Sequence, residues 1–303
     1  MRRQLLWGGA GVVLGMTIVL IVGWAPVHPF PVLNRIDVLV RTEYVNPSIN
    51  RERLEAGAIR GYLEAINDPY TRWIDANTFR HIKRRMSGQD DSATPTSTVT
   101  AMRLIHSTGY IRIGAFDSIS GAHDVEVSVK ALTQQGAQAL IVDVRNNSGG
   151  LYMTAANVAR LFLQTGVVVQ MINRSGKISI ERVRSPGKFV TIPMVVLVND
   201  RSASAAEIFA AAIQENGRGK IVGNPTYGKA AMQRLFPLPG GSALMLTTAR
   251  YLTPGGRDIS KVGIIPNNMV SKLVDSDVNG EDPQLETAIR LLGGIGDGLG
   301  PVR

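Results

Sequence analysis

Two hydrophobic patterns divide the chain. Between residues 27 and 87 the apolar residues recur at roughly helical spacing, with a break at 46–48 and a turn at Asp68-Pro69-Tyr70. Such spacing is typical of amphipathic helices. The sequence therefore predicts a small N-terminal helical module over 27–87.

The body of the chain, residues 101–293, alternates short apolar runs with amphipathic segments, which predict strands and helices respectively. We expect strands over 110–113, 139–144, 167–172, 178–183, 193–199, 221–222, 232–238 and 243–251, and helices over 123–133, 153–163, 203–216 and 284–292. This alternation predicts an α/β core with mixed strand pairing.

Polar residues separate the module from the body. The segment SGQDDSATPTSTVT, ending at Thr100, lacks large apolar residues. Residues 88–100 are therefore interpreted as a linker, and residues 294–303 as a C-terminal tail.

The N-terminus combines Arg2-Arg3 with an uncharged, mostly apolar run from Leu5 to Pro26. About 20 apolar residues match the thickness of a bilayer core. We expect residues 1–26 to form a transmembrane anchor. Because the arginines precede the run, the body is expected on the extracytoplasmic, periplasmic side of the cell membrane. A cleaved signal peptide is the alternative, although 23–26 has no A-x-A pattern.

Composition and charge narrow the functional classes. The net charge of +9 is spread over scattered Lys and Arg residues, few of them interleaved with aromatics. An anionic surface such as a bacterial membrane explains this charge at least as well as nucleic acid does. The absence of cysteine excludes disulfides, thiolate catalysis and cysteine-bound metals. The four histidines, at 28, 81, 106 and 123, are scattered, so we expect neither a metal site nor a cofactor.

Candidate chemistry lies in the run RSASAAE, residues 201–207, and in Lys229. Ser204 falls where a predicted strand passes into a helix, and the free N–H groups of a helix start stabilise an oxyanion. A lysine activates a serine only when neutral, and the weakly polar neighbours of Lys229 favour that form. Gln233 shares a strand face with Lys229 and is placed to hold the amine. The alternative is that Ser202 or Ser204 merely caps the helix.

The turn Asn146–Gly150 follows a buried strand and leads into a helix. Its glycines, Gly149 and Gly150, are able to present N–H groups to an incoming carbonyl. The small side chain of Ala203 leaves room for a substrate backbone. A phosphate loop lacks the required lysine spacing here, and a purely structural turn remains an alternative.

Taken together, these residues resemble the C-terminal processing peptidases, or tail-specific proteases. The resemblance runs from about residue 39 to 292 and rests on five blocks: NDPYTRWID, GYIRIGAF, ALIVDVRNNSGGLYMTAANVARLFL, VVLVNDRSASAAEIFAAAIQENGRGKIVGNPTYGKAAMQ and GSALMLTTARYLTPGGRDISKVGIIPN. It implies a mixed-sheet core like that of the crotonases and Clp proteases. It also implies that Ser204 is the nucleophile, Lys229 the base and Gln233 the residue that orients it. The N–H groups of Ala205 and Gly149 would form the oxyanion hole.

The sequence departs from this family in two places. Family members usually carry a PDZ domain between the helical module and the strand that begins GYI, where this chain has only its polar linker. PDZ domains bind an extended C-terminus, so C-terminal selectivity is in doubt. Ala206 also replaces the last serine of the usual SASASE run.

The sequence thus predicts a membrane-anchored serine endopeptidase that hydrolyses exported polypeptides, with a homo-oligomer or an adaptor protein as further expected partners. One alternative is a non-catalytic peptide-binding scaffold with the same fold. Another is a crotonase-type acyl-CoA enzyme, which fits poorly with export because CoA is cytoplasmic.

Overall fold

The computed structural model describes residues 30–46, 48–86, 98–271 and 282–293, which form two compact units divided after Gly57. No helix within these ranges is long and apolar enough to cross a bilayer. The predicted anchor, residues 1–26, lies outside the described residues.

The first unit contains a helix with no buried residue, α1 (Pro31–Glu43), which has a proline in its first turn. Such a proline suits a helix start because the first N–H groups have no intrahelical partner. An exposed ion pair joins Arg41 to Asp37 at 2.7 Å. Helix α2 (Arg51–Glu64) begins in this unit and ends in the second. Both helices agree with the helical spacing of the sequence.

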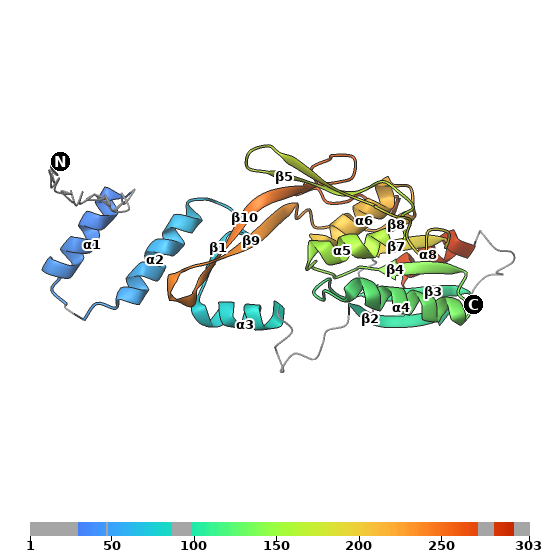
Figure 1. The fold of residues 1–303 in the computed structure, drawn as a ribbon, viewed down its shortest axis with the longest axis horizontal. Coiled ribbons are helices and arrows are strands. Elements are labelled where there is room, and N and C mark those ends of the chain that lie inside the picture. Colours follow the sequence, from blue (N-terminus) through green and yellow to red (C-terminus); the bar gives the residue numbers. More distant parts are fainter. Residues whose placement is uncertain (1–29, 47, 87–97, 272–281, 294–303) are drawn as a thin grey trace, which may run out of the picture. The chain divides into compact units, whose positions relative to one another are not determined.

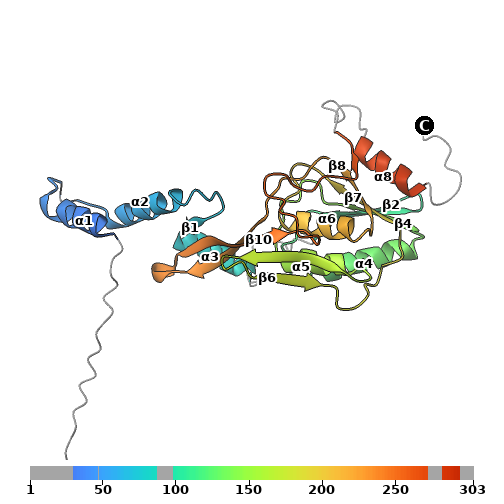
Figure 2. The same ribbon diagram turned by 90° about the horizontal axis from the view of Figure 1, so that it is seen from above.

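A six-stranded sheet, here called the central sheet, forms the core of the second unit (Figures 1 and 2). Its order is β11-β8-β7-β4-β3-β2, and only β2 and β3 pair antiparallel. Every residue of β4 and β7 is buried, which is typical of parallel strands covered on both faces. The strands are β2 (Val99–Ile105), β3 (Thr108–Ile113), β4 (Ala139–Asp143), β7 (Met194–Val198), β8 (Lys220–Gly223) and β11 (Asn268–Met269).

Helices cover the two faces of the central sheet. On one face α4 (Gly121–Gln134), α5 (Tyr152–Arg160) and α6 (Ala205–Glu215) pack around strand residues such as Leu140 and Val142. On the other face α8 (Pro283–Gly293) packs near Ile141. Neighbouring residues of one strand point to opposite faces, so a single apolar run supplies both layers.

A second, antiparallel sheet, here called the outer sheet, has the order β1-β10-β5-β6, with β9 also paired to β10. Because β9 follows β10 along most of its length, β1 and β5 share the opposite edge of β10. The strands are β1 (Arg72–Ile74), β5 (Val167–Asn173), β6 (Ile178–Arg182), β9 (Ala231–Pro237) and β10 (Ala243–Leu252). This sheet places the N-terminal β1 beside strands from the C-terminal half.

The structure differs from the predicted elements at three strands. β1 lies in a segment that was expected to be a turn leading into a helix, and the helix α3 (Ala76–Met86) follows it. β2 begins at Val99, so the predicted linker extends too far, and its residues 88–97 lie outside the described residues. β11 was not among the predicted strands and has only two residues. The other predicted domain boundaries stay predictions.

Candidate active site

Ser204 occupies a sharp turn between β7 and α6, with φ +56° and ψ −114°. A non-glycine residue rarely adopts a positive φ, and such strain persists only when the surrounding structure holds it. Two contacts hold this turn: the hydroxyl of buried Ser202 donates to Val144 O at 2.8 Å, and the N–H of Ala203 donates to Asn147 O at 2.9 Å. The half-buried Ser204 therefore lies at the first turn of a helix, as predicted.

The carboxylate of Glu207 lies fully buried beneath this turn and accepts four hydrogen bonds. Its Oε2 accepts the backbone N–H groups of Ser204 and Lys229, at 2.8 and 2.9 Å. Its Oε1 accepts the N–H of Gly228 at 2.7 Å and the hydroxyl of Thr226 at 2.5 Å. A buried carboxylate needs such partners to offset its desolvation. Glu207 thus joins the serine turn to the lysine loop.

The side chain of Lys229 is half-buried, and its Nζ lies 4.8 Å from the ring centroid of Tyr70. Burial lowers the pKa of Lys229, and the positive charge of Arg72 lowers it further. The carboxylates of Glu207 and Asp68 act in the opposite direction. The net effect is a lowered pKa, which moves Lys229 toward the neutral form that a general base requires.

The predicted dyad partners are brought to one site through their backbones. Among the described contacts, no hydrogen bond joins Ser204 Oγ to Lys229 Nζ. The amide of Gln233 donates to Thr247 Oγ1 at 3.4 Å, a long bond, and makes none to Lys229 in the described part of the chain. The orienting role of Gln233 stays a prediction.

Gly149 packs directly against the serine turn. A Cβ atom at this position would lie 2.9 Å from Ser204 Cβ and 3.1 Å from the nitrogen of Ala205. Its φ of +111°, like the +131° of Gly150, also suits glycine. Only a glycine therefore allows the turn Asn146–Gly150 to approach Ser204 this closely.

The N–H groups expected to form the oxyanion hole differ in whether they already have a hydrogen-bond acceptor. The N–H of Gly149 donates to Asn147 Oδ1 at 2.8 Å. The N–H groups of Ala205 and Gly150 have no acceptor among the described residues. Ala203, expected to bind substrate, is buried, and its carbonyl accepts from Ala206. The unoccupied donors beside Ser204 are therefore those of Ala205 and Gly150.

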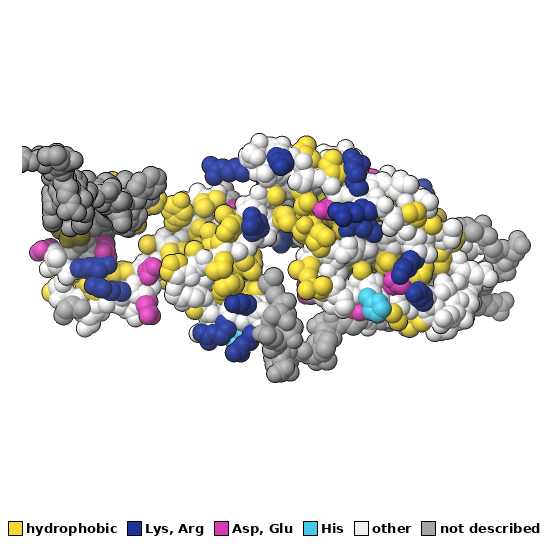
Figure 3. Space-filling model, viewed as in Figure 1, with side chains coloured by type: hydrophobic (Ala, Val, Ile, Leu, Met, Phe, Trp, Pro, Cys, Tyr) yellow, Lys and Arg dark blue, Asp and Glu magenta, His cyan; other side chains and the backbone are white. Residues whose placement is uncertain are grey.

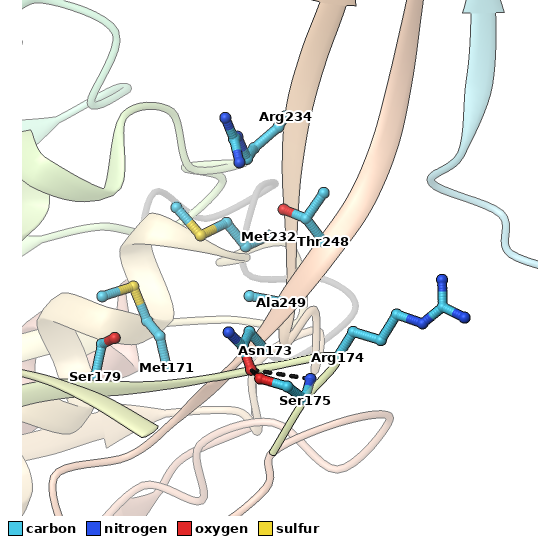
Figure 4. Close-up of a pocket in the computed structure, with 9 residues that line it drawn as sticks. All are labelled: Met171, Asn173, Arg174, Ser175, Ser179, Met232, Arg234, Thr248 and Ala249. Carbon is cyan, nitrogen blue, oxygen red and sulfur yellow. Dashed lines mark hydrogen bonds between the residues drawn. The ribbon is translucent and has the colours of Figure 1, made fainter. Parts of the chain in front are cut away.

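An open pocket of about 680 Å³ lies between the β5–β6 hairpin and strands β9 and β10 (Figure 4). The thioether side chains of Met171 and Met232 lie on one side of it, and Arg174 extends away from them. Met232 is only three residues from Lys229. The lining residues are Met171, Asn173, Arg174, Ser175, Ser179, Met232, Arg234, Thr248 and Ala249.

Three residues of the site were not identified from the sequence: Glu207, Asn147 and Tyr70. Glu207 carried a signal, because it is the one carboxylate in the otherwise apolar first two turns of α6. Tyr70 was interpreted as part of a turn. Its contact with Lys229 depends on pairing between β1 and β10, segments about 170 residues apart.

No cluster of His, Asp and Glu suited to a metal ion occurs within the described ranges.

The face shown in Figure 3 carries Lys and Arg side chains at separate places instead of in one continuous patch. The surface on this face agrees with the scattered basic residues of the sequence.

A mixed α/β fold with a strained serine at a helix start, beside a lysine of lowered pKa, is typical of serine hydrolases. The sequence model of Peptidase family S41 matches residues 107–270, more than half of the chain. The chain therefore belongs to Peptidase family S41.

Individual relatives agree with the resemblance seen in the motifs. The chain is 42% identical over 163 residues to a carboxyl-terminal-processing protease of Picosynechococcus sp., covering 54% of this chain and 39% of that protein. It is 40% identical over 192 residues to a carboxyl-terminal-processing protease of Synechocystis sp., covering 62% of this chain and 44% of that protein. The chain thus spans less than half the length of these curated relatives.

The fold is similar to that of a solved structure, the photosystem II D1 C-terminal processing protease. The TM-score is 0.61 at 23% identity, covering 86% of this chain and 90% of that chain. This likeness confirms the mixed α/β fold with two sheets.

Proposed function

We propose that the chain is a serine endopeptidase in which Ser204 is the nucleophile and Lys229 the general base. The observation that carries this proposal is the shared carboxylate of Glu207, which holds the backbones of both residues at one oxygen. The lowered pKa of Lys229, caused first by burial, supports the role of a neutral base.

In the proposed mechanism Ser204 Oγ attacks the carbonyl carbon of a peptide bond while Lys229 Nζ takes the hydroxyl proton. The oxyanion of the tetrahedral intermediate lies at the start of α6, where the N–H of Ala205 has no acceptor within the described part of the chain. Lys229 then passes the proton to the leaving amine as the C–N bond breaks. Water then attacks the acyl carbon while Lys229 takes its proton, and Lys229 returns that proton to Ser204 Oγ as the ester C–O bond breaks.

The second oxyanion donor comes from the Asn146–Gly150 turn. Family resemblance favours the N–H of Gly149, which must then leave Asn147 Oδ1. The N–H of Gly150 needs no such change because no described residue accepts it. Gly149 and Gly150 are thus the two candidates, and Gln233 is proposed to orient the lysine amine when substrate is bound.

Polypeptide substrates are proposed from the family and from the pocket beside β9. The open pocket between the β5–β6 hairpin and strands β9 and β10 lies along strand edges, where an extended chain is able to bind. Relatives are named for processing carboxyl termini. Comparing one peptide with a free and an amidated C-terminus tests whether this chain needs the terminal carboxylate. Because no PDZ domain was predicted, we expect equal rates.

Membrane anchoring through residues 1–26 is a further proposal, supported by the apolar run and the preceding arginines. Its test is fractionation of cells expressing the full chain, followed by protease treatment of intact spheroplasts. We expect the body in the membrane fraction and accessible from outside. Recovery of the body in the cytoplasmic fraction would contradict the proposal.

The catalytic proposal is tested by peptide hydrolysis with the purified full chain. Ser204→Ala and Lys229→Ala should each abolish turnover, whereas the exposed controls Ser107→Ala and Lys220→Ala should keep it. Hydrolysis that survives both active-site substitutions would overturn the assignment. Failure of the parent chain to hydrolyse any peptide would instead favour the scaffold alternative.

A further inference from the structure

The turn Asp68–Arg72 is attached to the outer sheet beside the lysine. The hydroxyl oxygen of Thr71 accepts the N–H of Thr247 at 3.1 Å, and Arg72 pairs in register with Met245 of β10. Thr71 is buried. This turn precedes the family match, which begins at residue 107, so the match itself assigns it no part in the site.

Within the turn, Tyr70 presents its ring to the lysine amine. The ring centroid lies 4.8 Å from Lys229 Nζ, within the range of a cation–π contact. The turn fixes the ring through its backbone, because Tyr70 N–H donates to Asp68 Oδ1 at 3.0 Å. Thr71 Oγ1 also donates to Asp68 Oδ2 at 2.6 Å. The carboxylate of Asp68 thus holds the turn on which the Tyr70 ring is mounted through two hydrogen bonds.

The charged groups that face the amine come from two elements. The turn supplies Arg72, which disfavours the ammonium form, and Asp68, which favours it. The start of α6 supplies Glu207, which also favours the ammonium form. The phenols of Tyr70 and Tyr227 are the neighbouring neutral groups, and burial raises the pKa of Tyr70. Among the described residues, Arg72 is therefore the side chain whose charge lowers the pKa of Lys229 in the same direction as burial.

We infer that the turn Asp68–Arg72 is a wall of the active site, which positions the Lys229 amine through the ring of Tyr70 and the charge of Arg72. The inference rests on the proposed function, since it concerns the lysine that would act as the base. Both are positioning residues, because they act through Lys229 and not on the substrate.

The charge of Arg72 is tested by the pH profile of kcat/KM for peptide hydrolysis. Its acid limb reports the pKa of the base in the free enzyme. Arg72→Gln removes a repulsive charge, so the pKa of Lys229 rises and the acid limb moves to higher pH. Asp68→Asn removes an attractive charge and moves the limb to lower pH. Arg184→Gln, an exposed control with the same charge change, leaves it in place.

The ring of Tyr70 is tested by comparing two substitutions at equal thermal stability. Tyr70→Leu removes the ring and should lower kcat by roughly tenfold or more, with a smaller change in KM. Tyr70→Phe keeps the ring and should recover most of that loss. Equal losses in both variants would overturn the role of the ring, and so would a change confined to KM.

A measurement without turnover separates this inference from the proposed function. In the Ser204→Ala background, NMR titration of ¹³C-lysine-labelled protein follows the amine directly, and Lys229→Arg assigns its signal. We expect its midpoint to rise with Arg72→Gln and to stay unchanged with Arg184→Gln. Identical midpoints in both variants would overturn the inference even in an active peptidase. A rise would support it even if peptide hydrolysis were absent.

Discussion

Ser204 and Lys229 share one hydrogen-bond acceptor, because both of their backbone N–H groups bond to Oε2 of Glu207. The two residues belong to different segments, a helix start and a loop before β9. One buried carboxylate therefore fixes the spacing of a strained serine and a half-buried lysine. The link acts on the two backbones and involves neither the hydroxyl of Ser204 nor the amine of Lys229.

Replacing Glu207 by Gln should uncouple these segments. The amide keeps the shape but loses one acceptor oxygen, so at least one of the four donors is left unpaired. We expect a loss of about 2 to 4 kcal/mol in unfolding free energy and at least a tenfold drop in kcat/KM. Urea denaturation and peptide hydrolysis measure the two effects. The exposed control Glu286→Gln should change neither; wild-type behaviour of Glu207→Gln would contradict the linking role.

Substituting Gly149 by Ala should push the turn Asn146–Gly150 away from Ser204, because the new Cβ would lie 2.9 Å from Ser204 Cβ. Gly136 offers a matched control, since it also has a positive φ but no atom within 4 Å of its Cβ position. Gly136→Ala should cost about 1 to 2 kcal/mol, from backbone strain alone, without loss of kcat. Gly149→Ala should be less stable and lose at least tenfold in kcat. Equal effects in the two variants would refute the close approach.

Lys229 should make the stability of the chain depend on pH. Its pKa is lowered in the folded state by burial first and Arg72 second, so the unfolded chain binds more protons between the folded pKa and the ordinary lysine pKa of 10.5. Wild-type stability therefore rises with pH across this window. Lys229→Met should be the more stable variant near neutral pH, and its advantage should shrink as the pH approaches 10.5. Urea melts of both proteins across this range provide the measurement. An advantage that does not change with pH would argue against a lowered pKa.

The guanidinium of Arg145 stabilises the start of the turn Asn146–Gly150. It contacts both oxygens of Asp282 at 2.8 Å and Asp143 at 2.7 Å, and Asp143 is fully buried. Removing one partner of a buried pair leaves an uncompensated charge. Arg145→Met should therefore cost about 3 kcal/mol or more of unfolding free energy.

An exposed ion pair provides the comparison for this substitution. Arg250 and Asp258 are 3.4 Å apart, and both side chains are solvent-accessible. Arg250→Met should cost less than about 1 kcal/mol. A similar loss for both substitutions would mean that the Arg145 pair contributes no more than a surface contact.

The strands and helices that the sequence predicts well are those with a local signal. The apolar runs at 139–144 and 193–199 became β4 and β7, which are buried on both faces. β1 has three residues, Arg72, Trp73 and Ile74, which form a strand only because β10 pairs with them. No local pattern predicts a pairing over such a sequence separation.

The active site likewise combines features that a local sequence pattern predicts with contacts that it does not predict. The strand-to-helix position of Ser204 was predictable from the apolar strand and the small residues that follow it. Ser204 and Glu207 have the spacing of a capping box, which explains one of the four hydrogen bonds of Glu207 but not the other three. The bond between Gly149 N–H and Asn147 Oδ1 depends on side-chain geometry that spacing does not encode.

The central claim is that Ser204 is a nucleophile activated by Lys229. Mass spectrometry of the full chain after treatment with a serine-reactive acylating probe tests it most directly. We predict one adduct per chain, on the peptide containing Ser204, formed faster as the pH rises through the pKa of Lys229 and undetectable in Lys229→Met. An unlabelled Ser204, or labelling that proceeds equally fast without the lysine amine, would contradict the account.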